Sequence, residues 1–434
     1  MVSPIHHPGD APLSALEKGV PPDVQNLAVD EVAGQGWNIL AEDIPLPVAV
    51  LKESGIRHNS EWMKSFLARS GTLLAPHGKT TMSPALFDLQ LSDGAWAITL
   101  STPHQVQVAR QFGYSRIFLA NQLVGAKAID YVISELERDP EFEFIFLVDD
   151  VDNVEAIASV ASRSSLGRPL QVLVEIGYPG GRTGCRSTEA AVELARVVKK
   201  HRRHLSLRGI EGFEGLLKGG DDTATLNLVN EFLDKMVSLA RACDEEDLFG
   251  TDQVILSAGG SSFYDVVVEK LRAAIMSRPS MVLVRSGCYI THDSILYAKA
   301  VKALRSRNPE LADHNGGLTP SLEVWAYVQS RPEPEKLIAA LGKRDISYDD
   351  QPIPLFWFRP GSGMTVPEPL HSSHIVTRLN DQHCHVTVPQ ESPLKVGDMV
   401  GFGISHPCLT FDKWRLMHVV DDQYRVQSSL RTYF

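Results

Sequence analysis

The feature that most constrains the fold is an alternation of short apolar runs with longer amphipathic stretches between residues 72 and 289. Continuous apolar runs of this kind are typical of strands that are buried on both faces, as in a parallel sheet. Amphipathic stretches such as 190–200 and 227–242 separate most of the runs and predict helices that pack on that sheet. The eight predicted strands are 72–76, 95–100, 116–120, 144–148, 170–176, 207–213, 253–258 and 281–289.

Eight such units over roughly 250 residues have the size of a (β/α)₈ barrel, and the main alternative from the pattern is a doubly wound open sheet. After Gly317 the rhythm changes to short strand-like runs separated by turn residues, and no helix is expected after Pro360. We therefore predict an α/β barrel over residues 46–317 and an all-β domain over residues 318–434. Residues 1–45, rich in Pro, Gly and Asp, predict an arm with little core of its own. The predicted strands of the second domain are 322–328, 355–358, 374–379, 385–388 and 415–419.

Composition excludes several classes of function. The net charge of -11 argues against a nucleic-acid partner, and the one basic run, 199–204, predicts a solvated helix end. Five cysteines in 434 residues give no disulfide framework, so we expect a reducing, cytoplasmic location. No apolar run reaches membrane-spanning length, and residues 1–10 lack the features of a secretion signal.

Lys79 stands directly after the first predicted strand and is followed by a helix start, with Ser83 as N-cap and Pro84 at the first helical position. Active sites of barrels of this kind lie at the C-terminal ends of the strands. A lysine in a partly desolvated pocket there is suited to covalent carbonyl chemistry, although a surface lysine is the simpler interpretation of this residue alone.

Other strand ends add compatible groups. A flexible loop, 177–185, carries Arg182 after the fifth predicted strand, and the loops after the seventh and eighth can present N–H groups and hydroxyls to a phosphate. A lysine, an arginine and a phosphate cradle together indicate pyridoxal phosphate bound covalently to Lys79. The candidate cofactor-binding residues are Lys79, His77, Arg182, Ser257, Gly259, Gly260, Arg285, Gly287, Cys288 and Tyr289.

A second candidate site lies near the C-terminus, where His406 and Cys408 stand two residues apart. On an extended segment their side chains would face the same side. An imidazole and a thiolate suit Zn²⁺, with Mn²⁺ or Mg²⁺ as alternatives, and so few protein ligands leave positions open for a substrate. The competing interpretation is a buried cysteine beside a loop histidine.

The sequence resembles the D-serine dehydratase and D-threonine aldolase-like family of fold-type III pyridoxal phosphate enzymes, whose barrel is related to that of alanine racemase. The resemblance runs from about residue 45 to the end and includes a subgroup described as D-serine deaminase-like. The segments that carry it are Pro-His-Gly-Lys-Thr at 76–80, Gly-Ile-Glu-Gly-Phe-Glu-Gly at 209–215, Arg-Ser-Gly-Cys-Tyr at 285–289 followed by Asp293, Leu-Asn-Asp-Gln-His at 379–383, and 406–414.

By position, the resemblance implies that Lys79 holds the cofactor and that Arg182 contacts its phenolic oxygen. Gly259, Gly260, Gly287 and Cys288 would bind the phosphate, and His406 and Cys408 the metal. It also implies a homodimer in which the partner's β domain helps to close the pocket. Arg285 occupies the position that contacts the pyridine nitrogen in the racemases.

Two departures from the family pattern bear on the reaction. A Glu-His-Gly segment of many members is replaced by Pro-Gln-Glu-Ser at 389–392, so the role of its histidine would be absent or fall to His383. The metal motif is His-x-Cys, as in D-serine dehydratases, rather than the His-x-Asp common in the aldolases. We therefore expect a D-3-hydroxy amino acid ammonia-lyase acting on a small D-amino acid. The alternatives are a D-threonine-type aldolase, an amino acid racemase and a non-catalytic pyridoxal phosphate carrier.

Overall fold

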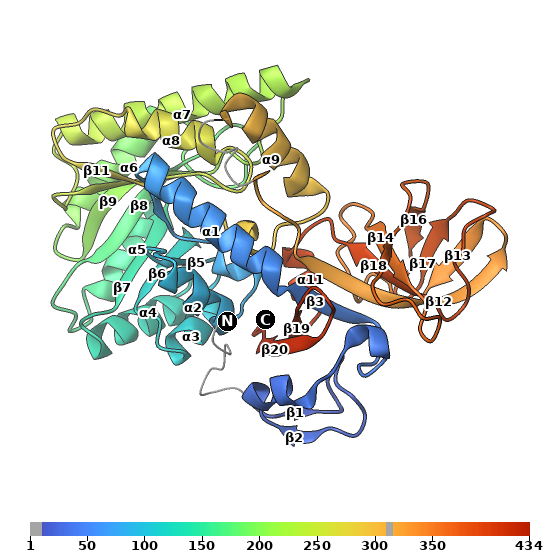
Figure 1. Ribbon diagram of the computed structural model, residues 1–434. Helices are drawn as coiled ribbons and strands as arrows, with labels where there is room; N and C mark the ends of the chain where they lie inside the picture. Colours follow the sequence, from blue (N-terminus) through green and yellow to red (C-terminus); the bar gives the residue numbers. More distant parts are fainter. Residues whose placement is uncertain (1–10, 310–315) are drawn as a thin grey trace.

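The computed structural model describes residues 11–309 and 316–434, and it contains the predicted barrel (Figure 1). Eight parallel strands lie in the order β4-β11-β10-β9-β8-β7-β6-β5. The barrel closes where Trp96 N donates to Leu74 O at 2.7 Å and where His77 bridges Thr99. The strands are β4 Leu73–Leu74, β5 Ile98–Leu100, β6 Arg116–Gln122, β7 Glu143–Val148, β8 Leu170–Ile176, β9 Leu205–Gly212, β10 Val254–Ser257 and β11 Ser280–Val284.

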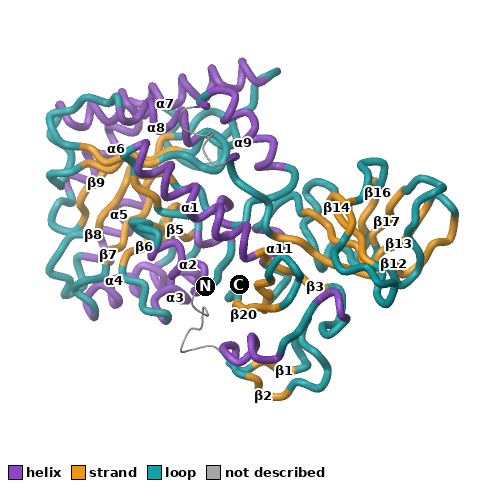
Figure 2. The backbone as a smooth tube through the Cα atoms, viewed as in Figure 1, coloured by secondary structure: helices purple, strands orange, loops and turns teal. Residues whose placement is uncertain are grey.

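Helices surround the barrel strands on the outside (Figure 2). Their starts follow capping rules, because side chains such as Thr102 and Asp150 accept the first free backbone N–H groups. One helix begins at Pro84 after N-cap Ser83, as predicted, and the basic run ends a helix at Lys200. The helices are α1 Glu53–Ser70, α2 Pro84–Ser92, α3 Pro103–Gln111, α4 Ala126–Arg138, α5 Val151–Ala161, α6 Thr188–Lys200, α7 Asp222–Glu245, α8 Tyr264–Arg272 and α9 Leu296–Arg307, with short 3-10 turns η3 Gly78–Thr80 and η4 Cys288–Ile290.

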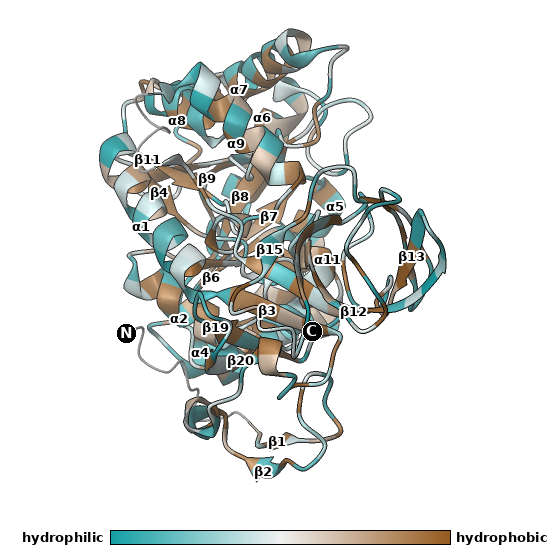
Figure 3. Cartoon of the chain, turned by 45° about the vertical axis from the view of Figure 1, so that its right-hand side comes forward, coloured by the Kyte–Doolittle hydropathy of each residue, from teal (hydrophilic) through white to brown (hydrophobic). Residues whose placement is uncertain are grey.

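Hydrophobic residues make up most of the barrel strands (Figure 3). The barrel interior holds a separate apolar cluster that includes Phe118, Ile145 and Leu173, and the larger core lies between the strands and helices. Burial on both faces explains why the strands read as continuous apolar runs in the sequence. Near the C-terminal strand ends, the charged residues Glu211 and Arg285 are both buried.

The second domain is a largely antiparallel sheet built around the long strand β12. It also contains the short helix α11 (Cys408–Phe411), so the expectation of no helix after Pro360 is wrong. Four residues are too few to show helical periodicity, and Pro407 takes the helical conformation at the N-cap. The strands are β12 Leu322–Glu333, β13 Lys336–Ala339, β14 Ile353–Phe358, β15 Glu368–Pro369, β16 Ile375–Leu379, β17 Cys384–Thr387, β18 Met399–Gly403, β19 Leu416–Val420 and β20 Val426–Arg431.

The N-terminal region packs on this second sheet. Strand β3 (Val48–Lys52) pairs antiparallel with β12 and parallel with β19, although it falls inside the range predicted for the barrel. The barrel chain itself therefore starts with α1. In the predicted arm, whose first ten residues lie outside the described part, buried side chains such as Val29 and Ile39 pack against the same sheet. The arm elements are β1 Leu13–Ser14, β2 Gln25–Leu27, η1 Val29–Gln35 and η2 Ile39–Ala41.

Candidate active site and metal centre

Lys79 lies in η3, directly after the first barrel strand. The turn needs Gly78, because a Cβ there would stand 2.5 Å from Ile98 Cγ2. Lys79 is half-buried, and its amine makes no hydrogen bond or ion pair with the residues that the structure describes. An amine without a fixed partner at the mouth of the barrel is suited to bind a carbonyl compound covalently.

Basic side chains gather around this lysine. Burial, together with the charges of Arg285, Lys79 and Arg182, holds the pKa of His77 well below its usual value, so His77 is neutral. Arg182 is exposed and lies over the ring of Phe213, 4.8 Å from its centroid. Several cationic groups around a neutral imidazole favour an anionic ligand.

The loops after β10 and β11 offer donors for such a ligand. The hydroxyls of Ser261 and Ser286 lie 3.1 Å apart, and the backbone N–H groups of Ser286 and Gly287 have no acceptor within residues 11–309 and 316–434. By contrast, Gly259 N and Gly260 N both donate to the buried carboxylate of Glu214, at 3.0 and 3.2 Å. The donors left for a phosphate are therefore those nearer Ser286.

Three other predicted residues point elsewhere or are already paired. The Ser257 hydroxyl donates to Leu283 O in the barrel wall at 3.0 Å, and the Tyr289 hydroxyl is directed toward Gln90 of α2. Arg285 forms an ion pair with Glu211 inside the barrel and donates to Gly212 O at 3.0 Å. Burial raises the pKa of Glu211 to about 8 despite this arginine. The Nε of Arg285 and one oxygen of Glu211 keep no partner, so this pair retains unused hydrogen-bonding capacity.

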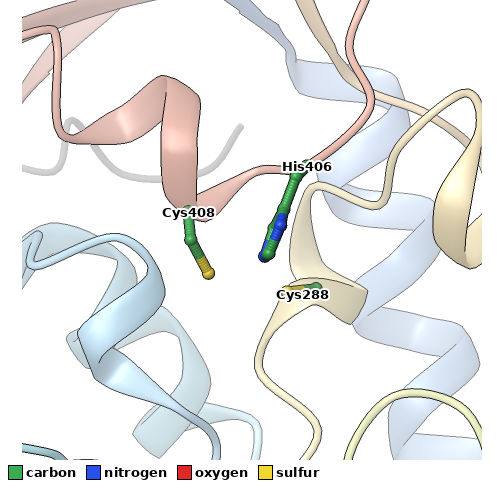
Figure 4. A group of neighbouring side chains, drawn as sticks. All are labelled: Cys288, His406 and Cys408. Carbon is green, nitrogen blue, oxygen red and sulfur yellow. The ribbon is translucent and has the colours of Figure 1, made fainter. Parts of the chain in front are cut away.

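His406 and Cys408 converge with a third residue, Cys288 of η4 (Figure 4). One ligand atom from each of the three lies within 4.8 Å of the others. The extended conformation expected for residues 406–408 is wrong, because the chain turns at Pro407 and Cys408 opens α11. This turn, rather than strand alternation, brings the imidazole and the thiol to the same side.

Asp349 fixes the orientation of His406. Its carboxylate accepts a hydrogen bond from His406 Nδ1 at 2.7 Å and another from the Ser405 hydroxyl at 2.6 Å. Because Asp349 engages Nδ1, Nε2 is the imidazole nitrogen available to a metal, as in carboxylate–histidine–metal sites. Burial opposes the charge of His406, but Cys408 and Asp349 raise its pKa to about 9. A hydrogen bond from Cys288, followed by the effect of His406, holds the pKa of Cys408 well below its usual value.

The two sites are adjacent. The Sγ of Cys408 lies 3.5 Å from Oγ1 of Thr80, the residue that follows Lys79. The residues therefore fit both groups that the resemblance implies. A free amine, unpaired N–H donors and basic side chains fit pyridoxal phosphate. An imidazole with thiols fits a divalent metal.

Several residues of this site were not identified from the sequence. Glu211 and Glu214 lie in a motif that carries the family resemblance. The structure was needed to show that both carboxylates are buried and which groups they contact. Asp349 carries no local signal, since its role depends on a contact with a distant segment. Thr80 belongs to the motif at 76–80, but that motif does not indicate its proximity to Cys408. His383, a candidate substitute for a missing family histidine, is exposed in the turn between β16 and β17, and its backbone carbonyl accepts from Asn380 N.

Comparison with known proteins agrees with this two-part architecture. The family described as "Alanine racemase, N-terminal domain" matches residues 52–257, and the family described as "Putative serine dehydratase domain" matches residues 321–420. A curated 3-hydroxy-D-aspartate aldolase from Paracoccus denitrificans (strain Pd 1222) is 24% identical over 51% of this chain and 56% of its own length. The match thus spans about half of that relative.

Solved structures share the fold over nearly the whole chain. D-threonine aldolase from Filomicrobium marinum superposes with a TM-score of 0.71 at 18% identity, covering 92% of this chain and 97% of that one. D-threo-3-hydroxyaspartate dehydratase from Delftia sp. HT23 gives a TM-score of 0.68 at 18% identity, covering 91% and 99%. No described helix of this protein has the length and apolarity needed to cross a membrane. The chain therefore joins an alanine racemase N-terminal domain to a serine dehydratase domain.

Proposed function

We propose that this protein is a pyridoxal phosphate- and metal-dependent ammonia-lyase that converts a D-3-hydroxy amino acid into a 2-oxo acid and ammonia. The observation that carries the proposal is the contact between the His406–Cys408 segment and the Lys79 turn, through Cys408 and Thr80 at 3.5 Å. A metal at the first segment and a cofactor at the second would act on adjacent atoms of one small substrate.

The residues have distinct tasks in this proposal. Lys79 would hold pyridoxal phosphate through Nζ, and as a free amine it would take the α-proton of the substrate on the same atom. Arg182 and the N–H groups near Ser286 hold the anionic parts of the cofactor. Pyridoxal phosphate, when bound, supplies the electron sink for the carbanion that forms at Cα.

The metal side has its own residues. His406 and Cys408 would hold the ion, and Asp349 keeps the imidazole in the orientation that exposes Nε2. A divalent ion, when bound, supplies the Lewis acidity that makes the substrate β-hydroxyl a better leaving group. A structural neighbour, a cysteine-to-alanine mutant of D-threo-3-hydroxyaspartate dehydratase, is described as being in the metal-free form, which is consistent with a metal in that enzyme.

The second candidate is a retro-aldol reaction that gives glycine and an aldehyde. It is favoured by the curated relatives, which are both 3-hydroxy-D-aspartate aldolases, and by the D-threonine aldolase fold. The serine dehydratase domain and the thiol at position 408 favour elimination.

A panel of D-3-hydroxy amino acids tests the proposal, with 2-oxo acid, ammonia, glycine and aldehyde all quantified. We expect 2-oxo acid and ammonia in equal amounts, and chelation should abolish their formation while the visible absorbance of the lysine-bound cofactor persists. Glycine and aldehyde as the main products would favour the aldolase instead. Undiminished turnover in metal-free enzyme would contradict both metal-assisted reactions and favour racemization.

A further inference from the structure

We propose that Cys288 is a third protein ligand of the metal at His406 and Cys408, so that the centre is a His-Cys-Cys site with one open position. The inference rests on the proposed metal dependence and adds a ligand that the barrel supplies. Cys288 lies in η4 after the last barrel strand, whereas His406 and Cys408 belong to the second domain.

The geometry is close to that of a bound ion. The three ligand atoms lie within 4.8 Å of one another, and their side chains project into a common space (Figure 4). A tetrahedral zinc with bonds of about 2.0–2.3 Å holds its ligand atoms roughly 3.5–3.8 Å apart. The side chains need to approach by only about 1 Å, which small side-chain rotations can provide.

The surroundings of Cys288 differ from those of a cysteine that only packs in a core. Its side chain is buried, with 4% of its surface exposed, yet the thiol lies 3.9 Å from Oγ1 of Thr80. The same hydroxyl is 3.5 Å from Sγ of Cys408. Thr80 therefore stands beside both sulfur atoms, on the turn that carries Lys79.

A second thiolate changes the properties of the centre. Two thiolates and a neutral imidazole balance the charge of a divalent ion, and soft ligands select Zn²⁺ over Mg²⁺ or Mn²⁺. Three protein ligands leave one position in a tetrahedral site, so a substrate hydroxyl would replace a single water. The ion would also join the barrel to the second domain and stabilise the folded protein by mass action.

X-ray absorption at the zinc edge tests the inference by counting sulfur ligands. We would compare the zinc-loaded holoenzyme, prepared with a reducing agent, with Cys288→Ser and Cys408→Ser. The expected counts are two sulfurs in the natural protein and one in each variant. Counts of one, one and zero would overturn the role of Cys288 and leave the metal at His406 and Cys408 intact. A natural protein without bound zinc would overturn this inference and the proposed metal dependence together.

Zinc affinity, measured by competition with a chelator, gives a second readout that does not depend on activity. Cys288→Ser should weaken binding by at least the ~10–100-fold typical of changes to residues that only support metal ligands. Cys243→Ala is the matched control, because this buried cysteine lies in α7 and is absent from the ligand cluster. Unchanged affinity in Cys288→Ser would overturn the inference, provided that thermal unfolding shows both variants to be folded.

Discussion

At the scale of single residues, the candidate cofactor site contains one lysine without a partner in the described residues, beside neighbours that are held by hydrogen bonds and ion pairs. Lys79 is free within the described residues, while Arg285 is held by Glu211 and by a carbonyl of β9. His77 donates its backbone N–H to Arg285 O at 3.1 Å, which ties the Lys79 turn to the last barrel strand. The reactive group can therefore change its bonding while the surrounding frame stays in place.

Reduction with borohydride should attach the cofactor to Lys79, and peptide mapping by mass spectrometry would locate the label. Lys79→Ala should lose the label and nearly all turnover, because no other group replaces its amine. Lys64→Ala is the control, since this half-exposed lysine of α1 pairs with the exposed Glu61 and the partly buried Asp93, away from the Lys79 turn. A label on another lysine would contradict the assignment.

The buried ring of His418 leads us to expect that the stability of the folded protein falls at acidic pH. Its ring is buried between Ser429 Oγ and Gly19 O, at 2.7 and 2.8 Å, and burial lowers its pKa from 6.5 to about 4. The unfolded chain therefore takes up the proton first. The stability due to the neutral ring is complete above pH 6.5 and is lost as the pH falls through 4, by up to about 3 kcal/mol.

Denaturant unfolding at several pH values checks this expectation. His418→Gln cannot gain that proton, so the difference in unfolding free energy from the natural protein should shrink between pH 7 and pH 4. His104→Gln, at an exposed position, should leave the pH dependence unchanged. A parallel pH profile for His418→Gln and the natural protein would contradict the argument.

At the scale of elements, the barrel strands could be predicted because burial on both faces leaves a continuous apolar signal. Some ends were predicted correctly, as for β8, whereas the last predicted run, 281–289, continues past β11 through a buried loop into η4, which a local pattern does not separate from the strand. In the second domain, β18 (Met399–Gly403) was missed because two glycines interrupt its pattern. Strand pairing depends on partners distant in sequence, which a local pattern does not contain.

The metal centre, too, could be predicted only in part, because a local sequence pattern does not contain partners that are distant in sequence. His406 and Cys408 were identifiable because they are two residues apart, whereas Cys288 reaches them only through the packing of η4 against the second domain. The family resemblance implies a phosphate role for Cys288 through its backbone, and that role remains a prediction because the thiol and the N–H group can act separately.

Gly287 tests how closely η4 must pack on the Lys79 turn. A Cβ at this position would stand 2.5 Å from His77 O, so Gly287→Ala should push the two apart. We expect a loss of stability of roughly 1–3 kcal/mol and weaker binding of pyridoxal phosphate, measured by equilibrium dialysis. Gly167→Ala has open space around its Cβ and should change stability by less than about 0.5 kcal/mol. Equal cofactor affinity in both variants would show that this contact does not position the turn.

At the scale of the whole molecule, the candidate site draws its residues from two domains. The barrel contributes Lys79 and Cys288, and the second domain contributes His406 and Cys408. Arg182 remains exposed at the rim of the barrel, which leaves room for another subunit to cover the cofactor.

We expect the active protein to be a homodimer with twice the chain mass of 47.8 kDa. Sedimentation equilibrium on the cofactor-loaded enzyme would measure this mass, and dilution below the dimer dissociation constant should reduce turnover, since the resemblance implies that a partner closes each pocket. Full activity in a species of single-chain mass would contradict the prediction.

The position of β3 also has a consequence for how the chain is made. Its apolar residues emerge from the ribosome early, but their antiparallel partner β12 begins about 270 residues later. At about 5–20 residues per second, this interval lasts roughly 15–55 s. During that time Val48, Ala49, Val50 and Leu51, all buried in the finished protein, have no sheet to join. Until the barrel has been translated, the nascent chain therefore carries an exposed apolar segment that must not associate with other chains. Slower translation would lengthen the time for which this segment is exposed.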